Sequence, residues 1–383
     1  MKIAHISTFY TPAIGGVKQV VEELSERQVK QGHEVHIYSS DWDKNQKIKI
    51  KEETIRGVKI HRCKHLFRLA NFAVIWPSLL PRLLEKNLDI IHSHGFGHLH
   101  FILAALAAKI KKIPHIHTTH CPWTSEFRSL PGRIGILISY NIFSRLALKY
   151  TTKVIAITPW ELGFIKKFGG KENQIIVIPN GTDKILFQKI KNNQFRKKHK
   201  IKQKYLVLFF GRLNPTKGPE KLAQAAINIS KKRKDIAFVW VGPDEGKAQE
   251  VEKLIKNHKN MKYLGPLRGK EKIAEMYQSA DVYVLPSYRE GLPLTLFEAM
   301  ASGLPIIASP VNGVPFEISQ PENGFFANYG DIKTLEENIL KILDNPKLAK
   351  KISQNNLKKA RQYDWDIITK RTTDLYKQCI KNS

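Results

Sequence analysis

Residues Ser287–Gly303 read SYREGLPLTLFEAMASG and place two carboxylates around a turn. The glycine and proline after Glu290 indicate the turn, and the apolar residues from Leu294 onward predict a helix. Glu290 then lies in the loop and Glu298 about one turn inside the helix. A carboxylate among so many apolar residues must be paired or bind a ligand. The alternative is a glutamate that caps the helix beside an unrelated one.

The same order of strand, loop and helix occurs elsewhere in the second half of the chain. Residues 205–210 predict a strand, Gly211–Gly218 a loop, and Pro219 the first position of a helix. Further strands are expected at 237–241, 262–264, 282–285 and 305–308. Strands that alternate with helices predict a parallel sheet with helices on both faces.

The first half repeats this pattern. Residues 2–7 predict a strand, and helical periodicity starts at Val17. Strands are also expected at 34–39, 89–92, 115–119, 154–157 and 175–178. Gly15 and Gly16 therefore lie between a strand and a helix, where backbone can approach an anion closely. A simple tight turn is the alternative.

The composition changes after Pro179-Asn180-Gly181, where a polar and basic segment covers residues 184–204. A chain of 383 residues is also long enough for two domains. We therefore predict an α/β protein with two Rossmann-like, doubly wound domains in tandem. The first covers residues 1–183 and the second residues 184–365.

Charge restricts the possible partners. The chain has 63 Lys and Arg against 34 Asp and Glu, a formal net charge of +29. This excess favours nucleic acid, an anionic membrane surface or a phosphate-bearing small molecule. No zinc-finger, helix-turn-helix or RNP-type motif occurs, so we expect no nucleic-acid partner, although a basic nucleic-acid-binding protein stays the alternative of another class. We expect a cytoplasmic protein, because neither a signal peptide nor a membrane-spanning run is recognisable.

Two cations follow the strand at 205–210. Arg212 and Lys217 lie in the loop at its carboxyl end, where open α/β sheets bind ligands. The planar guanidinium of arginine, with its paired N–H donors, and the compact ammonium charge of lysine both suit a diphosphate. The alternative is that both are solvated basic residues of a basic chain.

Histidines are concentrated in the first half. Zinc binding is disfavoured, because acidic and cysteine ligands are missing nearby. Hydrogen bonding to a sugar or phosphate is one interpretation, and structural histidines are the plainer one. The cluster comprises His92, His94, His98, His100, His115, His117 and His120.

The ordered motifs resemble the retaining glycosyltransferases of family 4, which have the GT-B fold. The resemblance extends nearly from end to end, and its specificity comes from the order of the motifs. They are Gly15-Gly16, Gly32-His33-Glu34-Val35, Asp89-Ile90-Ile91-His92, Pro179-Asn180-Gly181-Thr182-Asp183, Gly211-Arg212, Lys217-Gly218, Ala280-Asp281-Val282, and the segment from Glu290 through Glu298 to Gly303.

The resemblance implies a donor site for a nucleotide diphosphate sugar. Arg212 and Lys217 would bind the diphosphate and act in catalysis, and the backbone at Gly15 and Gly16 would approach it from the first domain. Glu298 would accept hydrogen bonds from the ribose.

The remaining implied roles concern the transferred sugar and the base. Glu290, with the backbone at Leu292, Leu294 and Thr295, would hold the sugar and the distal phosphate. Leu267 would lie beside the base. His120 would reach the sugar, as in lipid-directed members such as the phosphatidylinositol mannosyltransferases, with His117 as the competing residue.

The implied reaction moves a sugar from a UDP- or GDP-linked donor with retention of configuration, and Glu290 acts more as an electrostatic group than as a nucleophile. Cations and a helix N-terminus would meet the charge of the leaving diphosphate, so no metal and no cofactor are expected. A nucleotide-sugar epimerase or hydrolase is the alternative. The resemblance also implies a cleft between the domains and a last helix, 366–383, that returns to the first domain.

Two basic segments carry aromatic and leucine residues, 62–86 and 123–149. Such segments suit an anionic membrane interface. We therefore hypothesise a peripheral enzyme on the cytoplasmic face of the membrane with a lipid or lipid-linked acceptor. Ordinary amphipathic helices that cover a core are the alternative.

Overall fold

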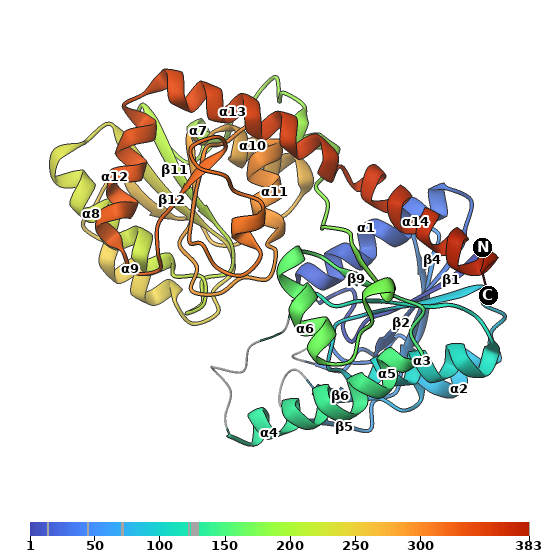
Figure 1. Ribbon diagram of the computed structural model, residues 1–383. Coiled ribbons are helices and arrows are strands. Elements are labelled where there is room, and N and C mark those ends of the chain that lie inside the picture. Colours follow the sequence, from blue (N-terminus) through green and yellow to red (C-terminus); the bar gives the residue numbers. More distant parts are fainter. Residues whose placement is uncertain (14, 44–45, 70–72, 122, 124–129, 383) are drawn as a thin grey trace. The chain divides into compact units, whose positions relative to one another are not determined.

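A computed structural model describes the chain except residues 14, 44–45, 70–72, 122, 124–129 and 383 (Figure 1). The chain forms two compact units. Unit 1 comprises Met1–Asn180 with Trp365–Ser383, and unit 2 comprises Gly181–Asp364. These boundaries lie within three residues of those expected from the sequence, 183/184 and 365/366.

Unit 1 contains an eight-stranded sheet in the order β10-β9-β8-β7-β1-β2-β4-β3. Its neighbouring strands are parallel except β3, which pairs antiparallel with β4. The strands are β1 (Lys2–Ile6), β2 (Glu34–Ser40), β3 (Glu52–Ile55), β4 (Val58–Cys63), β7 (Ile90–His94), β8 (His115–Thr118), β9 (Lys153–Ala156) and β10 (Ile175–Val177), and a separate hairpin consists of β5 (Phe67–Leu69) and β6 (Ala73–Ile75).

Side chains alternate across these strands, so the two faces of the sheet receive different helices. Ala4 and Ile6 of β1 pack with α2 and α3, whereas His5 points to α1. The C-terminal helix α14 packs on α1, where Arg27 and Asp366 form an ion pair of 2.8 Å. The helices are α1 (Gly16–Lys30), α2 (Leu79–Glu85), α3 (Leu99–Lys111), α4 (Leu130–Ile138), α5 (Arg145–Lys149), α6 (Leu162–Lys167) and α14 (Trp365–Lys381), and a π-helix (Ser139–Ser144) joins α4 to α5.

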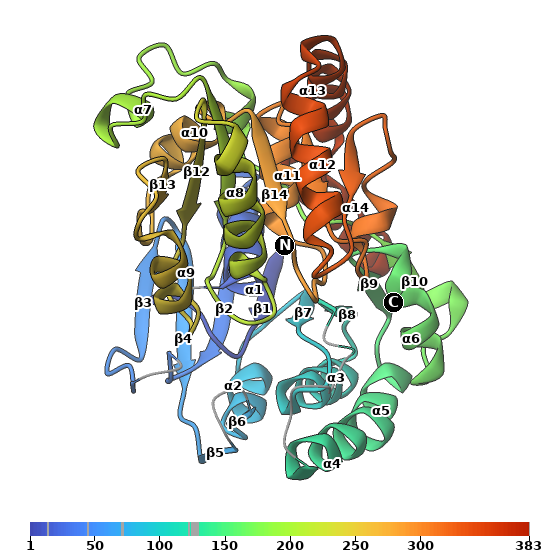
Figure 2. The same ribbon diagram turned by 90° about the vertical axis from the view of Figure 1, so that its left-hand side faces the viewer.

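Unit 2 has a six-stranded parallel sheet in the order β13-β12-β11-β14-β15-β16. Helices α8 and α9 lie next to each other over β12 and β13 (Figure 2). The strands are β11 (Tyr205–Phe210), β12 (Ile236–Val241), β13 (Met261–Tyr263), β14 (Val282–Leu285), β15 (Ile306–Ala308) and β16 (Gly324–Phe326). The helices are α7 (Phe195–Lys198), α8 (Pro219–Lys232), α9 (Ala248–Ile255), α10 (Lys270–Gln278), α11 (Leu294–Ala301), α12 (Ile332–Leu343) and α13 (Pro346–Ala360).

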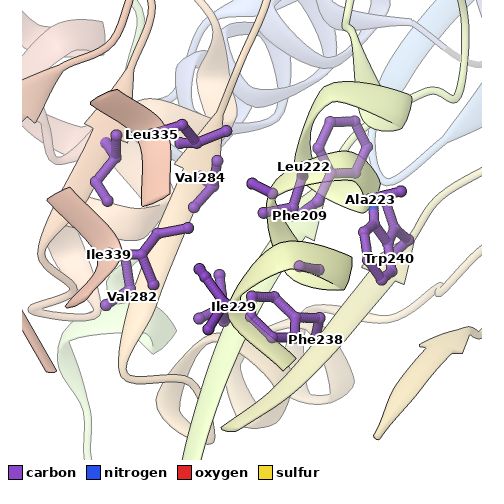
Figure 3. Packing of buried hydrophobic residues seen from close by; sticks show 14 of the residues in the cluster. Phe209, Leu222, Ala223, Ile229, Phe238, Trp240, Val282, Val284, Leu335 and Ile339 are labelled. Carbon is purple, nitrogen blue, oxygen red and sulfur yellow. The ribbon is translucent and has the colours of Figure 1, made fainter. Parts of the chain in front are cut away.

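One face of this sheet carries the main apolar core of unit 2. Figure 3 shows Phe209 of β11 and Trp240 of β12 beside Leu222 of α8, while Val284 of β14 faces Leu335 of α12. The strands are almost wholly apolar because helices cover both faces of a parallel sheet. Tyr283, between the core residues of β14, points to the opposite face and contacts Tyr277 of α10.

Part of the segment 62–86 differs from its interpretation as a membrane-facing surface, whereas Leu66 and Phe67 within it are exposed. Arg62 is buried at the end of β4, and Trp76 is fully buried in the core with α2 and α3. Trp76 therefore contributes to folding, and it is not available to a membrane. Phe72 and Arg128, from the two basic segments, lie outside the described residues.

Candidate active site

The order of the strands in unit 2 defines a switch point. β11 has β12 on one side and β14 on the other, so the chain leaves β11 and β14 toward opposite sides. Open α/β sheets bind ligands at such a point, outside the carboxyl ends of the strands. The loops that follow these two strands contain Arg212, Lys217 and Glu290.

Lys217 and Glu290 come together from the two loops. The Nζ of Lys217 lies 2.6 and 2.5 Å from the carboxylate oxygens of Glu290, and the two side chains are 15% and 4% exposed. Ser287 donates a further hydrogen bond of 2.6 Å to Glu290. The backbone N–H of Tyr288 donates to Thr216 and holds the loops together. The buried carboxylate is therefore paired, as the burial of a charge requires.

Arg212 lies at a more open position of the same edge. Its side chain is 44% exposed, and its guanidinium lies 2.8 Å from Glu245, which follows β12. Asn214, in the same loop as Arg212, donates to Glu245 and accepts from the backbone N–H of Lys217, so it joins the loop after β12 to the loop after β11. The sequence interpretation missed Asn214 and Glu245. The turn Gly242-Pro-Asp-Glu-Gly246, which follows a predicted strand, could have indicated a further loop at this edge with Glu245 in it.

A third loop approaches this edge through glycines. A Cβ on Gly242 would lie 1.8 Å from the carbonyl oxygen of Gly211, and its φ of +147° also favours glycine. The N–H of Gly242 donates to Gly265 in the loop after β13. Leu267, two residues further along, is half-buried at this edge. Leu267, the residue expected to lie beside the base, is therefore at the same carboxyl edge of the sheet as Arg212.

Glu298 lies in α11, which begins at Leu294 after the Glu290 loop. Its carboxylate accepts a hydrogen bond of 2.9 Å from the hydroxyl of Tyr277. Burial, with the Glu298 charge nearby, raises the pKa of Tyr277 well above its usual value, so the hydroxyl stays a donor. No local pattern in the sequence singled out Tyr277. Leu292 is buried, while Leu294 and Thr295 are half-buried at the start of the helix.

In unit 1, Gly15 and Gly16 lie at the carboxyl edge of the sheet, where α1 begins. Among the described residues, no atom lies within 4 Å of a Cβ built on either glycine. The backbone is therefore open at this helix start.

Histidines form a hydrogen-bonded chain beside this edge. Gln28 of α1 lies 2.7 Å from Nε2 of His5, whose Nδ1 lies 3.0 Å from Nε2 of His94. The Nδ1 of His94 lies 3.1 Å from Nε2 of His120. Burial lowers the pKa of His5 to about 4 and that of His120 to about 3, so both rings are neutral at pH 7.

Because each neutral ring has one donor and one acceptor nitrogen, all hydrogen bonds of this chain run in the same direction. With the Gln28 amide oxygen as the first acceptor, Nε2 of His5 carries the proton and Nδ1 must accept from His94. The same reasoning makes Nε2 of His120 a donor to His94. The Nδ1 of His120 is then left as an acceptor.

The competing residue, His117, has a different environment. Alternation along β8 turns it to the other face, where it is fully buried, lies 2.8 Å from Ser93 and stacks on Phe101. His120 follows β8 and is half-buried. Of the two, His120 has the more accessible ring.

Within the described ranges, one group of three side chains has the spacing of a metal site, namely His5, His92 and His94. All six ring nitrogens already have protein partners, because His92 contacts Thr118 and Tyr376 and the other two belong to the chain to His120. An ion would have to displace several of these hydrogen bonds. The group is therefore explained without a metal.

Comparisons with known proteins agree with this fold. Residues 191–359 match the family "Glycosyl transferases group 1", and residues 14–184 match "Glycosyltransferase Family 4". The N,N'-diacetylbacillosaminyl-diphospho-undecaprenol alpha-1,3-N-acetylgalactosaminyltransferase of Campylobacter jejuni is 30% identical over 78% of this chain and 79% of its own length. The UDP-Gal:alpha-D-GlcNAc-diphosphoundecaprenol alpha-1,3-galactosyltransferase of Escherichia coli is 27% identical over 90% and 88%.

Among solved structures, the sucrose-phosphate synthase of Thermosynechococcus elongatus has a TM-score of 0.79 at 23% identity, with both chains covered completely. The fold and these matches define a glycosyltransferase of the GT-B type. The chain belongs to glycosyltransferase family 4.

Proposed function

We propose that the protein moves a sugar from a UDP- or GDP-linked donor to a lipid or lipid-linked acceptor, with retention of configuration and without a metal. The observation that carries the donor assignment is the pair of Lys217 and Glu290 with Arg212 at the switch point of unit 2. The name of the Escherichia coli relative includes a UDP-linked sugar, and the names of both relatives include a diphosphoundecaprenol acceptor. These names support the same substrate classes here.

The chemistry fits these side chains. When the bond between sugar and phosphate breaks, its electrons pass to the departing diphosphate, whose negative charge increases. Arg212 and Lys217 supply positive charge at that place, and such preorganised charge stabilises a transition state. These cations can take the place of a metal ion. Glu298 would accept hydrogen bonds from the ribose, and the loop of Leu267 would lie beside the base.

Glu290 and His120 are the proposed groups for the sugar. Glu290 would orient the sugar and stabilise positive charge near its anomeric carbon, while Leu292, Leu294 and Thr295 offer backbone to the distal phosphate. The acceptor Nδ1 of His120 suits a sugar hydroxyl, and the backbone at Gly15 and Gly16 suits the diphosphate. The acceptor hydroxyl would attack from the side that the leaving group vacates, which retains configuration.

Thermal unfolding with UDP-, GDP- and ADP-sugars tests the donor proposal. One nucleotide class is expected to stabilise the wild type and to lose this effect in Glu298→Ala and Arg212→Ala. If no sugar nucleotide shifts the wild-type transition, the donor assignment is wrong. With the donor known, NMR of the product tests retention at the anomeric carbon, and activity after dialysis against EDTA tests metal independence.

A surface of unit 1 supports the membrane part of the proposal. Of the described helices, none combines the length and the apolar character that crossing a membrane requires. The stretch from α4 to α5 nevertheless exposes large apolar side chains together with Arg133, Arg145 and Lys149, a combination that suits an anionic lipid surface. The exposed apolar residues are Leu130, Ile134, Leu137, Ile138, Ile142, Phe143 and Leu146. We place this surface on the cytoplasmic face of a membrane.

Flotation with anionic vesicles tests this surface. Wild-type protein is expected to float at moderate salt, and Leu137→Glu with Ile142→Glu should stay at the bottom of the gradient. Phe316→Glu, at an exposed apolar residue of unit 2, is the matched control and should float. Equal flotation of all three proteins would exclude this surface as the membrane contact.

A further inference from the structure

Unit 1 has a cavity at its sheet edge that the proposed donor site does not use. The cavity has a volume of about 530 Å³. It lies beside the carboxyl ends of β2 and β4, where Asp41 and Arg62 are located, and is bounded by residues 47–51 and by the start of α2. Its lining is Asp41, Lys47, Ile48, Lys49, Lys51, Arg62, Lys64, Ser78 and Arg82.

Positive charge dominates this lining. Six of these residues are Lys or Arg and one is acidic. Three of the cations have carboxylate partners: Lys47 lies 3.7 Å from Asp41, Arg82 lies 2.7 Å from Glu52, and Arg62 pairs with Glu53.

The other three cations are Lys49, Lys51 and Lys64. In the part of the chain that the structure describes, they form no ion pair and are exposed. Three uncompensated ammonium groups around one cavity repel each other, and an anion with two or three negative charges would offset this. A diphosphate has this charge.

Arg62 fixes the base of the cavity. Its side chain is only 2% exposed, and its Nη atoms donate to the carbonyl oxygens of Ile50 and Thr11 at 3.1 and 2.8 Å. Its Nε is buried and has no hydrogen-bond partner among the described residues. A buried guanidinium with one unsatisfied N–H favours additional negative charge nearby.

The contact with Thr11 connects the cavity to the loop that leads to Gly15 and α1. The base of the cavity is thus joined through Thr11 to the loop that precedes the backbone proposed for the donor. Leu66 and Phe67 follow Lys64 in the chain, and both side chains are exposed. Apolar groups next to a cationic pocket suit a ligand with an apolar chain attached to its charged group.

We infer that this cavity binds the phosphate or diphosphate group of the sugar acceptor. The inference rests on the proposed function only in naming the acceptor as the source of the group. Lys49, Lys51 and Lys64 contact the oxygens of the group, and Arg62 holds the lysine-bearing segment in place. A lipid-linked diphosphate and a soluble phosphorylated compound share this chemistry.

Calorimetric titration of the full chain with inorganic pyrophosphate tests the cavity. The background is Arg212→Ala, so that binding at the donor site of unit 2 does not mask the result. In this background, Lys49→Gln, Lys51→Gln and Lys64→Gln together should weaken binding about tenfold to about a hundredfold, because each exposed ion pair contributes up to about 1 kcal/mol. The matched control changes three exposed lysines of α13 to Gln and should bind as the background does. They are Lys347, Lys351 and Lys358, which form no ion pair with the described residues.

Farnesyl diphosphate, with farnesol as its uncharged control, identifies the source of the group. Tighter binding than pyrophosphate indicates a lipid-linked acceptor, and equal binding indicates a soluble one. Absence of pyrophosphate binding in the background, or equal weakening by both sets of lysine changes, would overturn the inference. Neither result affects the donor assignment, which depends on sugar-nucleotide binding by the wild type.

Discussion

Removal of the Lys217 charge separates the structural from the ligand-binding role of the paired loops. Lys217→Ala leaves Glu290 buried without its cation, and breaking a buried pair from one side costs about 3–5 kcal/mol. For a unit of this size we expect a fall in Tm of about 10 °C. Arg212→Ala breaks a pair that is largely exposed, so it should cost at most about 1 kcal/mol and about 2 °C.

Differential scanning calorimetry without ligand, followed by titration with the stabilising nucleotide, measures both effects. Both variants should lose nucleotide stabilisation, while the large loss of intrinsic stability is expected for Lys217→Ala alone. Lys217→Met with Glu290→Gln removes both charges and should recover most of the Tm, but not nucleotide binding. A Lys217→Ala protein that melts within about 2 °C of the wild type would refute the buried-pair argument.

Two further predictions concern the sheets of the two units. Burial lowers the pKa of His5, His100 and His115 to about 4, 3 and 3, so below pH 6.5 the unfolded chain binds protons that folded unit 1 does not. The free energy of unfolding of unit 1 is therefore highest above pH 6.5 and should fall by about 1.4 kcal/mol per histidine at pH 5.5. Hydrogen exchange of β1 and β8, corrected for intrinsic rates, measures this fall. Equal protection at pH 5.5 and pH 7 would contradict it. Gly242→Ala should destabilise unit 2 by more than about 2 kcal/mol, because the added Cβ meets the carbonyl oxygen of Gly211. Urea unfolding tests this. Gly246→Ala is the comparison, because Gly246 also has a positive φ but has open space around its Cβ position.

Much of the architecture was accessible from local patterns. The strands predicted at 205–210 and 282–285 coincide with β11 and β14, because a strand buried on both faces of a parallel sheet is a short apolar run. Strand β4, which lies between β2 and the edge strand β3, was missed. It contains His61 and Arg62, which pair with glutamates of β3, and a long-range pair of this kind leaves no local apolar signal.

The sequence by itself determined the alternation of strands and helices and the loops that carry Arg212, Lys217 and Glu290. These depend on turn residues and on apolar periodicity over a few positions, which are local properties. The partners of these groups depend on the tertiary structure: Glu245 pairs with Arg212, and Tyr277 donates to Glu298. Strand order and register bring such groups together from distant positions, as in the contact of His5 with His94 across 89 residues. The chain from Gln28 to His120 and the cationic cavity exist for the same reason.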